Sequence, residues 1–343
     1  MIIRIYCTTN TAKSQTFVRI FREFFDKNEN LFINYERCII LSEVFMNYCE
    51  EMSYENVKNE VCALKREGKV EFFSIGRSLR GREIFCLTLG DGAECGIFVG
   101  VHHGMERITA ALILKFVRDI AEGNVWGGRT ADVLASRRIY FIPMLNPDGA
   151  EIALGNISEK EKAELSRLRG GKELRFWQAN ARGVDLNHNY DAGYYICRGD
   201  ERRAGIFTAG STRYGGAHAE SEPETRALCD FTREISENLA YTVALHTQGE
   251  EIYCGYDGKI PQGAEEMARA AAEKCGYVLA EPEAIASHGG YKDWVTDKFD
   301  IPSFTFECGL GKNPLPPTDF PAIYEKLSPV FADIVTFRKK RLQ

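Results

Sequence analysis

Residues 96–122, GIFVGVHHGMERITAALILKFVRDIAE, contain the pattern that decides the fold. Residues 96–101 are an apolar run of strand length, and residues 106–122 repeat apolar side chains at helical spacing and stop before a glycine. A strand that leads directly into a helix is typical of an α/β protein. His103 and Glu106 lie at the corner between the two elements, where side chains three positions apart converge.

The same alternation continues along the chain. We expect further strands and helices, in chain order, over residues 138–144 (strand), 223–235 (helix), 241–245 (strand), 263–275 (helix), 302–306 (strand) and 320–338 (helix). Residues 221–224, SEPE, are expected to form a capping box at the start of the second helix. This order predicts an α/β fold with a mixed, largely parallel sheet sandwiched between helices.

The first fifty residues differ from the rest. They contain two apolar-rich stretches, residues 17–25 and 39–48, and none of the motifs described below. We expect residues 1–50 to form a helical N-terminal extension and residues 51–343 to form the catalytic domain. The alternative is a start of translation near Met52, which would leave residues 1–50 outside the protein.

Composition limits the partners and the compartment. The 43 basic and 49 acidic residues give no electrostatic footprint for nucleic acid or an anionic membrane. No apolar run reaches the ~20 residues that span a bilayer, and the N-terminus shows no signal-peptide pattern. The eleven cysteines are scattered without a C-x-x-C pair, which favours a cytoplasmic, reducing location.

Three residues are candidate ligands of a single catalytic zinc ion. The spacing of His103 and Glu106 is weak evidence by itself, because His188 and Asp191 repeat it. His246 ends the expected strand 241–245 and supplies a third ligand at the same kind of position. Three protein ligands leave the fourth position of a catalytic zinc open. We therefore predict one zinc ion per chain.

Other residues of the sequence are candidates for supporting roles at this site. Glu307 ends an apolar strand, where an unpaired carboxylate is costly unless it must exchange protons, so we predict it as the general base and acid. Asp185 fits a carboxylate that orients a metal-bound histidine. His102 is expected to point away from the metal, and residues 146–149, NPDG, are interpreted as a structural turn.

Together these segments resemble the metallocarboxypeptidase family (M14) of zinc peptidases over roughly residues 53–338. Within it the chain is most similar to the bacterial γ-D-glutamyl-L-diamino acid endopeptidases, which cut cell-wall peptides. The segments that carry this closer similarity are residues 212–216 (TRYGG), 246–253 (HTQGEEIY), 290–294 (GYKDW) and 311–316 (GKNPLP).

The resemblance implies the same zinc ligands, general base and orienting carboxylate that the residues themselves suggest. It further implies a set of substrate-binding residues: Asn187, His188, Gln248, Glu250 and Tyr291.

Three departures from the family pattern bear on the substrate. Digestive members have Asn-Arg where this chain has Asn187-His188, and that arginine clamps the terminal carboxylate of the substrate. Gln178 stands where the family has an arginine that polarises the scissile carbonyl, and Arg182 is the candidate to replace it. A further family tyrosine is replaced by Ile285.

We therefore expect a zinc peptidase that cleaves γ-D-glutamyl–diamino acid bonds of cell-wall peptides in the cytoplasm. Two alternatives stay open: a carboxypeptidase that trims ordinary peptides, and a zinc amidase or deacylase that acts on small acylated amino acids. A non-catalytic binding module with the same fold is a third, and the presence of Glu307 argues against it.

Overall fold

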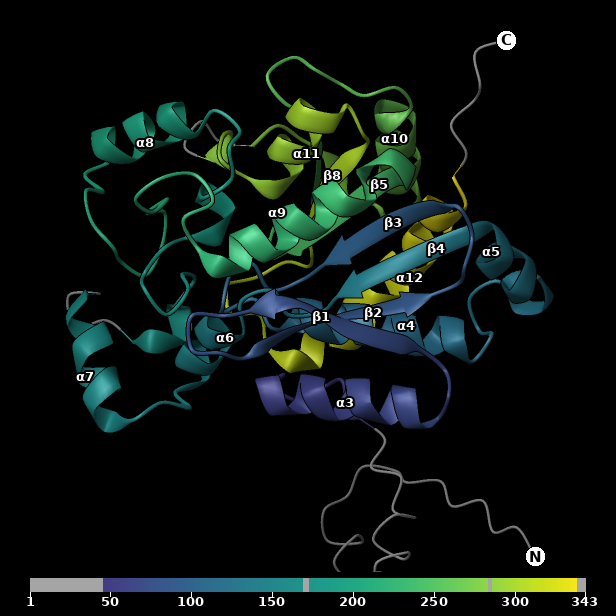
Figure 1. The fold of residues 1–343 in the computed structure, drawn as a ribbon, viewed down its shortest axis with the longest axis horizontal. Coiled ribbons are helices and arrows are strands. Elements are labelled where there is room, and N and C mark those ends of the chain that lie inside the picture. Colours follow the sequence, from purple (N-terminus) through teal and green to yellow (C-terminus); the bar gives the residue numbers. More distant parts are fainter. Residues whose placement is uncertain (1–45, 169–172, 283–285, 338–343) are drawn as a thin grey trace, which may run out of the picture. The chain divides into compact units, whose positions relative to one another are not determined.

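A mixed sheet forms the centre of the computed structural model, which describes residues 46–168, 173–282 and 286–337 (Figure 1). Within these residues the sheet has eight strands in the order β1-β2-β4-β3-β5-β8-β6-β7. Strands β4, β3, β5 and β8 at its centre are mutually parallel, whereas β1–β2, β2–β4 and β6–β8 are antiparallel. The strands are β1 Glu71–Arg77, β2 Glu83–Leu89, β3 Glu94–Val99, β4 Arg137–Ile142, β5 Leu239–His246, β6 Glu251–Cys254, β7 Val278–Leu279 and β8 Ser303–Glu307.

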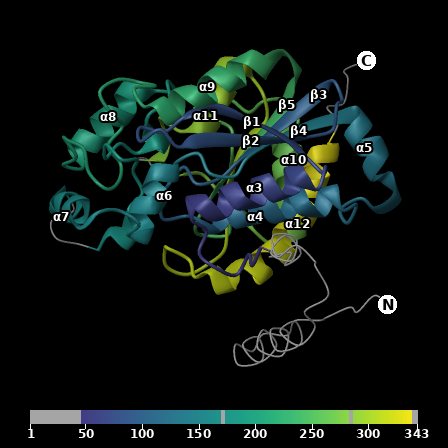
Figure 2. The same ribbon diagram turned by 60° about the horizontal axis from the view of Figure 1, so that its bottom comes forward.

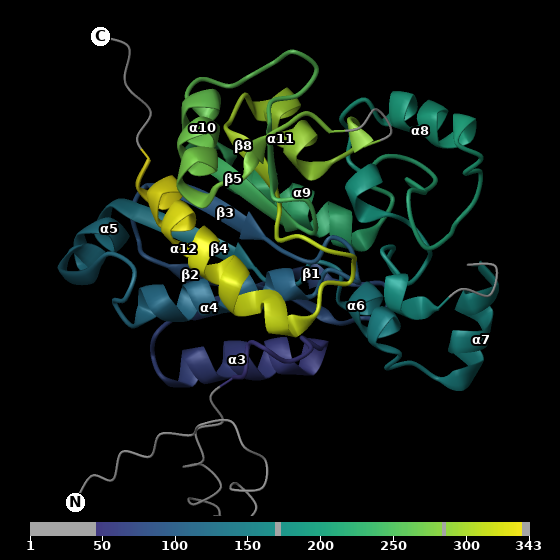
Figure 3. The ribbon, with the colours of Figure 1, turned by 180° about the vertical axis from the view of Figure 1, so that it is seen from behind.

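Helices cover both faces of the sheet. Helices α9 and α11 lie on one face, and α4 and α12 lie on the other, as the view from behind shows (Figure 3). Helix α3 packs against α4 outside the sheet (Figure 2). The helices are α3 Tyr54–Arg66, α4 Ile108–Ala121, α5 Thr130–Ser136, α6 Pro147–Leu154, α7 Glu159–Leu168, α8 Tyr194–Arg203, α9 Pro223–Ile235, α10 Ala264–Cys275, α11 Tyr291–Phe299 and α12 Phe320–Thr336. No helix of the described residues is long and apolar enough to cross a membrane.

Alternating side chains of the central strands fill two cores. On β3, Ile97 and Val99 belong to the cluster that includes α9 and α11. Phe98 points the other way and contacts Phe116 of α4 and Phe331 of α12. Burial on both faces explains the continuous apolar runs of these strands.

The predicted fold class is confirmed. The expected strands and helices are present with boundaries shifted by a few residues, and the largely parallel sheet lies between two helical layers. Strands β1, β2, β6 and β7 toward the edges were not among the expected elements, although β2 contains a buried apolar run over residues 84–87.

Two local predictions were wrong. The capping box does not form: Glu222 is the N-cap of α9 without a side-chain cap, and the Ser221 hydroxyl donates to the Glu222 carboxylate instead. Helix α4 begins at Ile108 rather than Glu106, because Glu106 lies in a turn whose amide donates to the His103 carbonyl.

The residues just before position 51 pack with the rest of the described chain. Residues from Asn47 onward belong to one unit, and Tyr48 stacks on Phe320 of α12 and donates to Glu60 of α3. The expected helical extension over residues 1–50 lies almost entirely outside the described residues and stays a prediction.

Candidate metal centre

The three expected metal ligands meet at the carboxyl ends of two parallel strands. His103 and Glu106 follow β3, and His246 is the last residue of β5, the parallel neighbour of β3. His103 Nδ1 lies 2.9 Å from Glu106 Oε1, and His246 Nδ1 lies 3.1 Å from Glu106 Oε2. The structure therefore brings together residues that are 140 positions apart, where ligands gather in α/β folds.

This donor set fits a zinc ion. The Nδ1 atoms of His103 and His246 are only 3.3 Å apart, each with a Glu106 oxygen beside it. One ligand atom from each of the three residues lies within 4.8 Å of the others. Two imidazoles and one carboxylate, with a fourth position free, match the ligand set of a catalytic zinc.

Asp185 orients His103 from behind. Its Oδ1 lies 3.1 Å from His103 Nε2, so the carboxylate can hold the proton on Nε2 and leave Nδ1 free to bind metal. Burial opposes ionisation of Asp185, but the charges of His103 and His188 and a hydrogen bond from the Arg213 amide hold the pKa of this carboxyl well below its usual range. The predicted orienting position of Asp185 agrees with this geometry.

Negative charge surrounds His103. Burial by itself would lower the pKa of His103, yet the Glu106 and Asp185 carboxylates raise this pKa well above its ordinary value. The same pair of carboxylates favours any cation at this point, whether it is a proton or a metal ion.

The turn that presents His103 is tightly constrained. Val101 has a φ of 51°, a left-handed conformation that is strained for a β-branched residue. Gly104 lies so close to the start of α6 that an added Cβ would approach the Gly149 carbonyl carbon to 2.3 Å. Strain and close packing of this kind are typical of a turn that positions functional side chains.

Asn146 holds this turn from the neighbouring loop. It is fully buried, and its Nδ2 donates to the carbonyls of His102 at 3.0 Å and Ala179 at 3.2 Å. Its Oδ1 accepts from the Gly149 amide and caps α6. The structural reading of residues 146–149 is thus supported, although they begin a helix rather than form an isolated turn.

Glu307 stands next to the metal ligands. It ends β8 and is paired in register with His246 of β5. Burial, reinforced by the charge of Glu106, raises the pKa of Glu307 to about 8. A carboxyl group that can take and release a proton near neutral pH suits general base and acid chemistry.

His102 packs beside this cluster, with its ring stacked on the ring of His246 at a centroid distance of 5.2 Å. Its side chain is completely buried and its Nε2 lies 3.0 Å from the Tyr190 hydroxyl. The expectation that His102 packs instead of binding metal is consistent with this position.

The position of the family's carboxylate clamp is taken by a histidine that turns inward. The His188 side chain is 8% exposed, and its Nδ1 lies 3.1 Å from Glu201 Oε1 and 3.2 Å from Cys197 Sγ. Burial lowers the pKa of His188, so it offers no cation to a substrate. Asn187 uses its Oδ1 to accept the Tyr291 amide. Neither side chain has a contact that supports a substrate role.

His188, Cys197 and Glu201 are close enough to be considered as a second metal site. However, the Arg198 guanidinium already pairs with the Glu201 carboxylate, so positive charge is present at this cluster. We interpret it as a buried polar network that fixes α8 to the site.

Two of the other expected substrate-binding residues are placed elsewhere. Tyr291 is fully buried, and its hydroxyl bonds Thr232 of α9, so the prediction that it contacts substrate is corrected. Glu250 pairs with Lys326 of α12 at 2.5 Å, so its carboxylate is engaged with the protein itself. Gln248 is exposed and accepts the Gly311 amide, so it stays a candidate.

Arg182 does not contact the cluster. Its side chain is 57% exposed and its Nη1 lies 3.4 Å from Glu222 Oε1. Gln178, at the family's arginine position, accepts from the Thr212 hydroxyl. The catalytic role of Arg182 therefore stays a prediction without a supporting contact, and Ile285 lies outside the described residues.

Arg213 is a neighbour of the site that the sequence did not reveal. Its backbone amide donates to Asp185 Oδ2 at 2.7 Å. It lies in a segment quoted above only for its family resemblance, and an exposed arginine carries no periodic signal.

Comparison with known proteins identifies the class. The profile of the M14 peptidase family, described as zinc carboxypeptidase, matches residues 61–329, so the chain belongs to this family. It is accordingly a hydrolase of the peptidase class.

Relatives and solved structures agree with this assignment. The chain is 30% identical to γ-D-glutamyl-L-diamino acid endopeptidase 1 of Lysinibacillus sphaericus over 75% of this chain and 65% of that protein. It is 32% identical to the uncharacterized protein YqgT of Bacillus subtilis (strain 168) over 74% of this chain and 69% of that protein. The chain thus spans slightly less than two thirds of the endopeptidase. The crystal structure of carboxypeptidase A from Helicoverpa armigera matches with a TM-score of 0.65 at 20% identity over 84% of this chain and 73% of that chain, which shows the fold alone.

Proposed function

We propose that the chain is a zinc-dependent endopeptidase that cleaves the bond between a γ-D-glutamyl residue and a diamino acid in cell-wall peptides. The observation that carries the proposal is the burial of His188. Where digestive relatives hold a guanidinium for a terminal carboxylate, this chain has a neutral imidazole paired with Glu201. A site without that clamp holds a terminal carboxylate poorly, which disfavours plain C-terminal trimming. The similarity to a named γ-D-glutamyl-L-diamino acid endopeptidase supports the same substrate class.

Each residue of the site has a separate role in the proposed hydrolysis. His103, Glu106 and His246 would hold zinc, which supplies a Lewis acid and lowers the pKa of water when bound. Asp185 keeps the His103 tautomer that leaves Nδ1 free. Glu307 takes the proton of the attacking water and delivers it to the leaving amine. Burial and the charge of Glu106 raise the pKa of Glu307 to about 8, and a bound cation would lower this pKa toward neutrality.

The cytoplasm is the proposed location of this activity. All nine cysteines of the described residues are free thiols, and seven of them are buried. Unpaired thiols suit a reducing compartment. The corresponding role is turnover of wall-derived peptides inside the cell, and neither nucleic acid nor membrane is proposed as a partner.

A hydrolysis panel tests the substrate. The zinc-loaded protein is offered a γ-D-Glu–meso-diaminopimelate peptide and ordinary L-peptides that end in a free carboxylate. We expect cleavage of the γ-D-glutamyl bond and little trimming of the L-peptides. Efficient trimming of the L-peptides, with the γ-D-glutamyl peptide left intact, would establish the carboxypeptidase alternative instead.

A further inference from the structure

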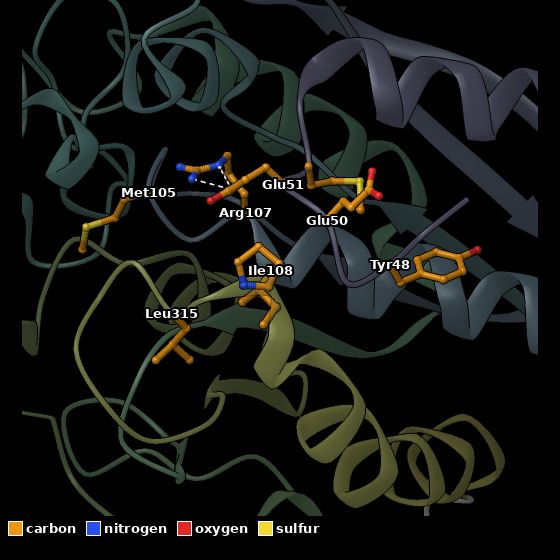
Figure 4. A pocket seen from close by; sticks show the side chains of 9 residues that line it. Tyr48, Glu50, Glu51, Met105, Arg107, Ile108 and Leu315 are labelled. Carbon is orange, nitrogen blue, oxygen red and sulfur yellow. Dashed lines mark hydrogen bonds and ion pairs between the residues drawn. The ribbon is translucent and has the colours of Figure 1, made fainter. Parts of the chain in front are cut away.

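Most arginines near the site form an ion pair with a carboxylate of the protein. Three are paired: Arg107 with Glu51, Arg182 with Glu222 and Arg198 with Glu201. Figure 4 shows Arg107, the residue after a metal ligand, joined to Glu51 by dashed lines. These three guanidinium groups are therefore engaged with the protein itself.

Arg213 is the exception. Its side chain is exposed, and among the described residues no carboxylate pairs with it. Its charge still reaches the site, because it contributes to lowering the pKa of buried His188. A guanidinium without a carboxylate partner, on a residue whose backbone amide bonds Asp185, is available to an anionic group of the substrate.

One carboxylate links Arg213 to the metal centre. Asp185 accepts the Arg213 amide on Oδ2 at 2.7 Å and lies 3.1 Å from His103 Nε2 through Oδ1. The backbone of Arg213 is therefore fixed relative to a metal ligand through a single side chain. Arg213 also has a φ of 63°, a left-handed conformation that a non-glycine residue adopts only where its surroundings demand it.

The residues that follow Arg213 are clamped as well. The Gly215 carbonyl accepts Asn189 Nδ2 at 2.7 Å, and the Gly215 amide donates to Glu201 Oε2 at 3.3 Å. The Gly216 carbonyl accepts the Tyr194 hydroxyl at 2.9 Å. These hydrogen bonds fix the backbone from which the Arg213 side chain extends. Less conformational entropy is then lost when the side chain binds a ligand.

We propose that Arg213 binds a carboxylate of the substrate beside the scissile bond. The inference rests on the proposed function, since a peptide that ends in γ-D-glutamyl–diaminopimelate has a free carboxylate on each side of the bond. One belongs to the α-carbon of the glutamyl residue, and the other belongs to the diamino acid whose amine leaves. Both offer the same chemistry to a guanidinium.

The test uses the zinc-loaded full chain and three peptides. The first carries both carboxylates, the second has an amide at the glutamyl α-carboxyl, and the third has an amide at the diamino acid carboxyl next to the cleaved bond. Arg213→Ala, Arg213→Lys and the control Arg202→Ala are compared with the parent. Arg202 is likewise exposed and without a partner among the described residues, but it lies on the last turn of α8.

We expect Arg213→Ala to lower kcat/KM for the first peptide by about 10–100-fold, because a charge-assisted hydrogen bond is lost. One of the two amidated peptides should be cleaved equally well by parent and variant, and its identity reveals which carboxylate Arg213 binds. Arg213→Lys should retain part of the activity, and Arg202→Ala should match the parent. Equal losses on all three peptides, or no loss on any, would overturn the proposal.

A measurement of peptide affinity in an inactive variant tests the role of Arg213 without relying on turnover. In the Glu307→Gln background, calorimetry of the same peptides should show that Arg213→Ala weakens affinity for the first peptide but not for one amidated peptide. If the parent cleaves only ordinary L-peptides, the proposed function fails. The role of Arg213 is then decided by the same comparison on L-peptides with a free or amidated C-terminus.

Discussion

Glu307 is the direct register partner of His246 across the parallel pair of β5 and β8. This pairing brings a carboxyl group with a raised pKa beside a candidate metal ligand without any contribution from a loop. Rigid strands position functional side chains more accurately than loops do.

Glu307→Gln should retain its zinc and lose most of its turnover. The amide preserves the shape of the side chain but cannot accept a proton, and general acid–base catalysis contributes about 10²–10⁴-fold. Steady-state kinetics and elemental analysis of the same preparation measure both effects. A loss of less than tenfold would argue against this role of Glu307.

His103→Ala and His246→Ala should each lose zinc. The Nδ1 atoms of the two side chains lie 3.3 Å apart and face the same candidate metal position. Removing either one leaves two protein ligands, which bind zinc much more weakly than three. His218→Ala is the matched control, because the His218 imidazole is exposed and, among the described residues, bonds the neighbouring Ala219 carbonyl. Elemental analysis after dialysis should find zinc in the control and the parent; full retention in either ligand variant contradicts the assignment.

The grouping of His103, Glu106 and His246 could be predicted from sequence because each lies at or just after the end of an apolar strand, and the ends of parallel strands share one edge of the sheet. Side-chain direction beyond the strands could not be predicted in the same way. Tyr291 looked like a substrate contact, but Thr232 on another helix captures its hydroxyl. Glu250 forms an ion pair with Lys326, 76 positions away. Such long-range partners leave no periodic trace in the sequence.

Asp185→Asn should weaken zinc binding by about 10–100-fold. The variant removes the charge that opposes His103, and an amide group cannot accept both the His103 N–H and the Arg213 N–H. Competition with a chelator measures the zinc affinity. An unchanged affinity would show that Asp185 does not orient the ligand.

Glu224 should make stability depend on pH. It is fully buried on α9, and burial raises its pKa to about 7 from an ordinary value of 4.5. The fold therefore favours the protonated carboxyl. This contribution to stability is complete below about pH 4.5 and is lost as the pH rises to 7.

The variant Glu224→Gln isolates this effect, because the amide cannot ionise. Relative to the parent, its free energy of unfolding should rise by about 3 kcal/mol between pH 4.5 and 8, from the difference between the two pKa values. Denaturant unfolding of the parent and the variant at both pH values provides the comparison. A constant difference between them would show that Glu224 does not titrate in this range.

The central claim is that one zinc ion, held by His103, Glu106 and His246, is responsible for peptide hydrolysis. The most direct measurement strips the protein of metal and titrates zinc back while cleavage of a γ-D-Glu–meso-diaminopimelate peptide is followed. We expect no cleavage without metal and a rate that rises to a plateau at one zinc per chain. Cleavage by the metal-free protein, or a plateau only at two zinc ions per chain, would contradict it.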